Sequence, residues 1–136
     1  MLSLLDLYRS FGDLAGTACG DGEAEDSYSV AKLLGGDEAF YENRPFLVSD
    51  TGGFASSVGD FAIRKGPWKL IVLATPDKDP GAKRKVPIED AVDRRLLFNL
   101  EEDPQESTNV IRENPEIAAE LEELLEKVKL SGSRTL

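Results

Sequence analysis

Residues 68–74 constrain the fold of this chain more than any other segment, because they read as a β-strand with apolar side chains on both faces. Trp68, Leu70 and Val72 alternate with Ile71 and Leu73. A strand of this kind lies inside a sheet that is covered on both sides. The rest of the 136 residues must therefore supply neighbouring strands and covering layers.

The sequence before and after this strand predicts three more. Residues 60–64 alternate between apolar and polar side chains, and Gly66 with Pro67 joins them to the central strand as a tight hairpin. Two outer strands and two long polar loops complete this part of the prediction: strands at 46–48 and 95–100, loops at 49–58 and 75–93.

A long helix is predicted over residues 115–130. Asn114 is a good N-cap and Pro115 a good first-turn residue. Glu123 and Lys127 form an i,i+4 pair in the favourable order. The apolar stripe that should pack on the sheet consists of Ile117, Leu121, Leu124, Leu125 and Val128.

Two further helices are predicted before the sheet. Residues 2–15 carry apolar side chains at helical spacing, and Gly16 is a plausible stop. A short helix at 28–34 is capped by Asp26-Ser27 and ended by Gly35-Gly36. The predicted fold class is α+β: a small antiparallel sheet of about four strands, a long C-terminal helix packed on it, and helices N-terminal to it.

Charge and composition exclude several functions. The formal net charge is -10, and such a field repels nucleic acids and anionic membranes. The chain has no histidine, which removes histidine-dependent triads and the usual zinc ligand. No apolar run is long enough to span a membrane, and Met1 is not followed by a secretory signal. The sequence leaves the localisation unknown.

No complete catalytic constellation or metal site is recognised in the sequence. The candidate substrate-binding residues are Ser49, Asp50 and Thr51, because they follow a strand and open into a Gly-rich loop. Cys19 is interpreted as an inert loop cysteine, since no histidine is available to activate it. Three other segments favour structural readings: the acidic loop 21–26, whose spacing does not fit an EF-hand; the basic run 83–85; and the turn 103–109, where Glu106 and Asn109 would bond backbone amides.

Four segments in order resemble the C-terminal part of sulfatases of the arylsulfatase type, within the alkaline-phosphatase-like superfamily. The hairpin at 59–71 (GDFAIRKGPWKLI) followed by the turn at 97–109 (LFNLEEDPQESTN) is the most specific pair. The helix at 6–16 (DLYRSFGDLAG) and the segment at 25–35 (EDSYSVAKLLG) also match the family pattern. In the family, the strand before the Gly-rich loop often ends in a histidine pair, where this chain has Ser49 and Asp50.

The resemblance implies a fragment that completes a sulfatase fold and one wall of its substrate cleft, and that is inactive alone. Residues 1–36 would join the missing core, and residues 37–136 would form the C-terminal subdomain. Calcium and formylglycine are implied for a full-length sulfatase acting on a sulfate ester, but no cofactor is expected in this chain, which lacks the Cys/Ser-x-Pro-x-Arg motif. A full-length member would be periplasmic or secreted.

Without the core, the helix at 2–15 loses partner surface for Leu4, Leu7, Phe11 and Leu14. We therefore expect this face to be exposed, or to mediate self-association. Two other classes of protein remain open from sequence: a stand-alone, non-catalytic binding module, and a fragment of a related phosphodiesterase or phosphonate hydrolase.

Overall fold

The chain forms two compact units in the computed structural model, residues 1–45 with 128–136 and residues 46–127. Each unit is described separately. The residues that the structure describes are 2–17, 19–20, 22–37, 44–50, 60–74 and 92–131. The predicted loop at 75–93, including the basic run 83–85, lies almost entirely outside them.

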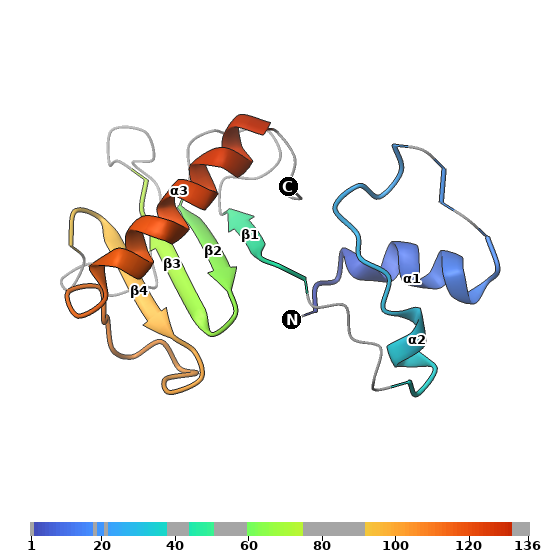
Figure 1. Ribbon diagram of the computed structural model, residues 1–136, viewed down its shortest axis with the longest axis horizontal. Helices are drawn as coiled ribbons and strands as arrows, with labels where there is room; N and C mark the ends of the chain where they lie inside the picture. The colour runs from blue at the N-terminus through green and yellow to red at the C-terminus, as the bar shows by residue number, and fades with distance from the viewer. Residues whose placement is uncertain are drawn as a thin grey trace. The chain divides into compact units, whose positions relative to one another are not determined.

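Residues 46–127 contain a four-stranded antiparallel sheet in the order β1-β2-β3-β4 (Figure 1). Each strand pairs with its neighbour in the sequence, and the β2-β3 hairpin occupies the centre. The predicted α+β class, the four strands and their central hairpin are thus confirmed. The strands are β1 (Leu47–Asp50), β2 (Phe61–Lys65), β3 (Trp68–Val72) and β4 (Arg95–Asn99).

The register explains why β3 is apolar on both sides. Ile63, Leu70 and Leu97 stand opposite one another on β2, β3 and β4, so they share one face, and all three are completely buried. The other face carries a second buried cluster, which extends just past the strand ends and consists of Ile71, Leu73, Leu96 and Phe98. The predicted burial of both faces is confirmed.

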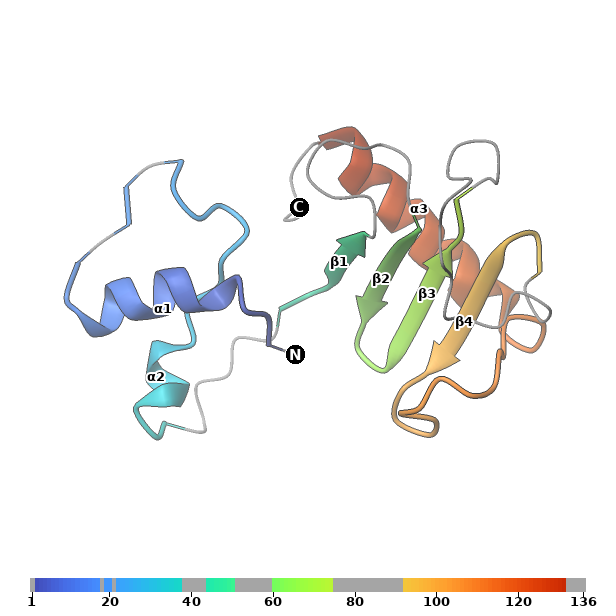
Figure 2. The same ribbon diagram turned by 180° about the vertical axis from the view of Figure 1, so that it is seen from behind.

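Helix α3 (Pro115–Ser131) runs across one face of the sheet, as both views show (Figure 1 and Figure 2). Two ion pairs identify that face. Nζ of Lys65 on β2 lies 2.5 Å from Oε1 of Glu120, and Nη1 of Arg95 on β4 lies 2.7 Å from Oε2 of Glu122. Arg95 and Lys65 point to the same side of the sheet as Ile63, so α3 covers the face that carries Ile63, Leu70 and Leu97.

The buried stripe of α3 differs slightly from the predicted one. Leu121, Leu125 and Val128 are buried as expected, but Ile117 and Leu124 are only half-buried. Ala118 takes a central place in the stripe instead, because it lies one heptad before Leu125. The predicted pair of Glu123 and Lys127 is confirmed, with 2.7 Å between Oε1 and Nζ.

Residues 1–45 contain two helices, α1 (Asp6–Leu14) and α2 (Ala31–Leu34). Both are shorter than predicted. The predicted cap of the second helix is wrong: the helix starts after Val30, which makes no side-chain cap bond within the described residues. The hydroxyl of Ser27 accepts the N–H of Arg9 instead, at 3.2 Å. The stop at Gly35-Gly36 is confirmed, with Gly36 at a φ of +92° that favours glycine.

Candidate functional site

The structure separates the side chains of the candidate substrate residues. Ser49 and Asp50 belong to the end of β1, so the predicted loop begins later than expected, and Thr51 lies outside the described residues. Ser49 pairs with Ala62 and Asp50 with Phe61, which places their side chains on opposite faces of the sheet. The exposed hydroxyl of Ser49 and the half-buried carboxylate of Asp50 therefore do not converge on one ligand atom.

The structure instead gathers buried polar groups around Asp6, at the start of α1. The carboxylate of Asp6 accepts the N–H of Tyr28 on Oδ1 at 3.0 Å and the N–H of Ser3 on Oδ2 at 2.8 Å. Oδ1 also accepts a hydrogen bond from Nη2 of Arg44, with which it forms a buried ion pair. Asp6 is 1% exposed and Arg44 3%, so water contributes little to solvating either charge.

Arg44 binds two further groups of the segment that leads to α2. Its Nη2 donates to the carbonyl oxygen of Asp26 at 2.8 Å, and its guanidinium carbon lies 4.6 Å from the centroid of the Tyr28 ring. A guanidinium above an aromatic ring is favourable, and more so in a buried place. Arg44 thus contacts both Asp6 at the start of α1 and residues 26–28, and holds these two segments together.

The serine hydroxyls complete this network. Oγ of Ser10 donates to the carbonyl oxygen of Asp6 at 2.5 Å and accepts the N–H of Val30 at 2.9 Å. Ser10 is completely buried, and Ser27 is 6% exposed. The side of α1 that faces the rest of its unit is therefore polar.

These contacts give Asp6 a structural role. Burial alone would raise the pKa of Asp6, but hydrogen bonds from Arg44, Tyr28 and Ser3, together with the charge of Arg44, outweigh it and hold the pKa below its usual value. A carboxylate with a lowered pKa and occupied oxygens is a poor general base. The network stabilises the fold of residues 2–30 and does not form a catalytic centre.

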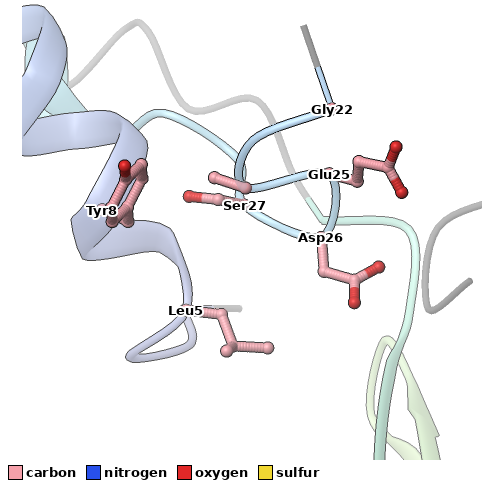
Figure 3. A pocket seen from close by; sticks show the side chains of 7 residues that line it. Leu5, Tyr8, Gly22, Glu25, Asp26 and Ser27 are labelled. Carbon is pink, nitrogen blue, oxygen red and sulfur yellow. The ribbon is translucent and has the colours of Figure 1, made fainter. Parts of the chain in front are cut away.

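A hollow with a volume of 380 Å³ borders the start of α1. Figure 3 shows Leu5 and Tyr8 on its helical side, and the loop from Gly22 to Ser27 on the other. Glu25 and Asp26 bring carboxylates to its lining, so the hollow combines apolar surface with negative charge. Such a lining suits an apolar group that is accompanied by a basic one.

The apolar side of α1 is exposed. Leu4 before the helix is 86% exposed, and Tyr8 and Phe11 within it are 59% and 58% exposed. The expectation that this face lacks a complete partner surface within the chain is confirmed, except that Leu7 is half-buried. Leu2, Leu5 and Leu14 extend the exposed surface.

The turn after β4 is held by side chains, largely as predicted. Oδ1 of Asn109 accepts the N–H groups of Leu97 and Ile111, at 2.9 and 3.2 Å. The N–H of Thr108 donates to Asp103 at 2.8 Å and lowers the pKa of that carboxyl. The prediction for Glu106 is wrong: its carboxylate pairs with Nζ of Lys69 on β3, at 2.6 Å from Oε1. The charged ammonium group of a lysine attracts the carboxylate more strongly than a neutral amide does.

The described residues do not fit a metal ion, because none of their histidine, cysteine, aspartate or glutamate side chains form a group of three or more. The acidic loop at 22–26 instead makes local contacts, such as the N–H of Gly20 donating to Oε2 of Glu23 at 3.1 Å. Cys19 is a half-buried free thiol. None of the helices in the described ranges has both the length and the apolar character required to cross a membrane.

No family model matches the chain, but comparison with known proteins finds two informative relatives. An N-acetylgalactosamine-6-O-sulfatase of Bacteroides thetaiotaomicron is 33% identical over 131 residues, which are 95% of this chain and 24% of that protein. Arylsulfatase K of Mus musculus is 29% identical over 133 residues, 94% of this chain and 21% of that protein.

A solved structure shares the fold as well. It comes from work on glycosaminoglycan metabolism by Bacteroides thetaiotaomicron and superposes with a TM-score of 0.62 at 30% identity. The match covers 92% of this chain and 24% of that structure. The chain thus spans about a quarter of the length of the proteins it matches.

These matches identify the class: the chain is a C-terminal portion of a sulfatase-like protein. The resemblance inferred from the four sequence segments is confirmed. The pairing of Asp6 with Arg44 had no such signal, because 38 residues separate the two side chains and no sequence pattern connects them.

Proposed function

We propose that the chain is the C-terminal quarter of an enzyme that hydrolyses sulfate esters of carbohydrates, and that it completes the enzyme's fold and one wall of its substrate cleft. The observation that carries this proposal is the 33% identity, over 95% of the chain, with an N-acetylgalactosamine-6-O-sulfatase. The glycosaminoglycan context of the structural relative supports a sulfated sugar over a simple aryl sulfate.

The proposal also divides this quarter into two parts, as the sequence resemblance implies: residues 1–36 join the core of the enzyme, and residues 37–136 form the C-terminal subdomain. Ser49, Asp50 and Thr51 remain the candidates for substrate contact at the end of β1. Because Ser49 and Asp50 point to opposite faces of the sheet, at most one of them faces a given substrate group.

The chemical step is assigned to the rest of the enzyme. Sulfatases require calcium and a formylglycine, and the described residues of this chain supply no cluster that fits the cation. The single cysteine, Cys19, is followed by Gly-Asp-Gly and does not lie in a Cys-x-Pro-x-Arg motif. We therefore expect the 136-residue chain alone to release no sulfate.

A chimera tests this proposal. Residues 1–136 replace the matched quarter of the Bacteroides thetaiotaomicron N-acetylgalactosamine-6-O-sulfatase, and sulfate release from N-acetylgalactosamine 6-sulfate is measured. The proposal predicts turnover by the chimera and none by the chain alone or by the truncated relative. A chimera without sulfate release contradicts the proposal, and so does sulfate release by the chain alone.

A further inference from the structure

Arg64 on β2 presents a guanidinium group whose outer nitrogens are unused. Its Nε donates to the carbonyl oxygen of Gly66 at 3.2 Å, which holds the half-buried side chain beside the hairpin turn. Nη1 and Nη2 make no hydrogen bond or ion pair within the part of the chain that the structure describes. Two donors on one planar group match the oxygens of a carboxylate or a sulfate. The side chain is thus oriented for an anion.

The nearest charged neighbours of Arg64 leave it positive. Lys69 on β3 stands directly opposite Arg64, on the face of the sheet opposite α3. Side chains paired in this way have Cβ atoms about 5 Å apart, and like charges there are unfavourable. Nζ of Lys69 lies 2.6 and 2.8 Å from the two carboxylate oxygens of Glu106, so Glu106 offsets the lysine. The three side chains together keep one positive charge, and it belongs to Arg64.

One candidate substrate residue shares this face, which Figure 2 shows in front of α3. Ser49 pairs with Ala62, two residues before Arg64, so all three side chains lie on the face opposite α3. Asp50 lies on the α3 side instead. Ser49 is exposed and is the diagonal neighbour of Arg64, at a distance of about 7–8 Å. An oligosaccharide on this face can therefore contact both side chains.

We propose that Arg64 binds a second anionic group of the substrate, a carboxylate or a further sulfate, beside the sulfate ester that is cleaved. This inference rests on the proposed function. Because the chemical step is assigned to the rest of the enzyme, Arg64 serves recognition and not bond cleavage. The formal net charge of the chain is -10, so an anionic substrate needs a local positive charge to bind here.

The test measures substrate preference in the chimera described above. The three substrates are N-acetylgalactosamine 6-sulfate, the same sugar with a second sulfate, and a disaccharide that links it to a uronic acid. Arg64→Gln is compared with Arg112→Gln, which removes the same charge at an exposed position outside the sheet. The readouts are kcat/KM for each substrate and the midpoint temperature of unfolding.

The proposal predicts that Arg64→Gln lowers the preference for at least one doubly charged substrate over the singly charged one by about tenfold. The substrate that loses its advantage identifies the anion as sulfate or carboxylate. Arg112→Gln should leave the preference unchanged. An equal loss on all three substrates overturns the proposal. A lower unfolding midpoint with an unchanged preference also overturns it, because Arg64 would then pair with an acidic side chain in the rest of the enzyme.

A binding measurement separates this proposal from the proposed function. If the chimera releases no sulfate, the proposed function fails, and the isolated chain is titrated with the two doubly charged sugars. The amide shifts of Ser49 and Gly66 are followed by NMR. Saturable shifts that Arg64→Gln abolishes and Arg112→Gln retains support the anion site. Shifts that are absent, or equal in the two variants, refute it.

Discussion

The two longest helices of this chain place their apolar side chains in opposite environments. Helix α3 buries Leu121 and Leu125, which are 2% and 0% exposed. Helix α1 leaves Leu4 and Phe11 86% and 58% exposed, and buries Asp6 and Ser10. The periodicity of the sequence is amphipathic in both helices, so it does not distinguish an apolar stripe that the chain covers from one that it does not.

The difference shows how each helix is held. Helix α3 is stabilised by burial of apolar side chains, each contributing about 1.5–3 kcal/mol. Helix α1 is held by hydrogen bonds and the buried pair of Asp6 and Arg44. Buried ion pairs add little net stability but are costly to break, because the partner that remains keeps an uncompensated charge. The position of α1 in its unit therefore depends on a few buried polar groups.

The largest effect is expected for Asp6→Asn. It leaves the guanidinium of Arg44 buried without its counter-charge and weakens the bond to the N–H of Tyr28. We expect a loss of about 3–5 kcal/mol in the local stability of residues 2–30. Amide hydrogen exchange at Tyr28 and Val30 measures it. The exposed Asp13→Asn is the control on the same helix; equal effects of the two variants would contradict the assigned role.

Leu125→Ala removes a completely buried side chain from α3, and the cavity should cost about 2–5 kcal/mol in the free energy of unfolding. Leu4→Ala removes the same atoms from an exposed position, and a change within about 0.5 kcal/mol is expected. Urea unfolding, followed by the fluorescence of Trp68 for Leu125→Ala and by far-ultraviolet circular dichroism for both, provides the measurement. A similar cost at both positions would remove the contrast between the helices.

Acid should weaken the α1 region through Asp6. Its pKa is lower in the folded chain than the value of about 3.9 for an unfolded aspartate. Its contribution to stability is therefore complete above about pH 4 and is lost as the pH falls through the lower, folded value. The amide proton shift of Tyr28, followed by NMR, should titrate below pH 4 and stop doing so in Asp6→Asn. A midpoint above 4 would show that burial outweighs the hydrogen bonds.

The smallest effect concerns the exposed pair of Lys65 and Glu120 between β2 and α3, whose side chains are 49% and 62% exposed. A double-mutant cycle with Lys65→Met and Glu120→Gln should give a coupling of about 0.2–1 kcal/mol, and less at high salt. A coupling comparable to the effect of Leu125→Ala would mean that charges, more than apolar burial, hold α3 to the sheet.

The sequence predicts the sheet unit better than the helical unit, for a physical reason. Local alternation and turn residues predict the strands and the hairpin. The hydrogen bond from the N–H of Leu97 to Asn109 also joins residues that are close in the sequence. The pairing of Asp6 with Arg44 depends on tertiary structure over 38 residues, and no local pattern encodes it. The partner of Glu106 is not predicted for the same reason, because Lys69 lies on β3, 37 residues earlier in the chain.

Dependence on a distant partner also explains why Ser49 and Asp50 lie in a strand and not in the predicted loop. A Gly-rich stretch after a strand indicates a loop, but pairing with β2 extends β1 through Ser49 and Asp50. Strand ends depend on the partner strand as much as on their own residues. Apolar periodicity predicted both long helices, although α1 spans Asp6–Leu14 and not the whole of 2–15. Only the structure shows which apolar face lacks a cover.

Hydroxyl-radical footprinting of Tyr8 and Phe11 tests most directly whether residues 1–36 join the core of the enzyme, since both rings react in proportion to their exposure to water. The isolated chain and the chimera with the Bacteroides thetaiotaomicron relative are labelled side by side, with the exposed Leu130 as an internal reference. We predict strong labelling of Tyr8 and Phe11 in the isolated chain and clear protection in the chimera, with Leu130 unchanged. Equal labelling of the two rings in both proteins would contradict the account.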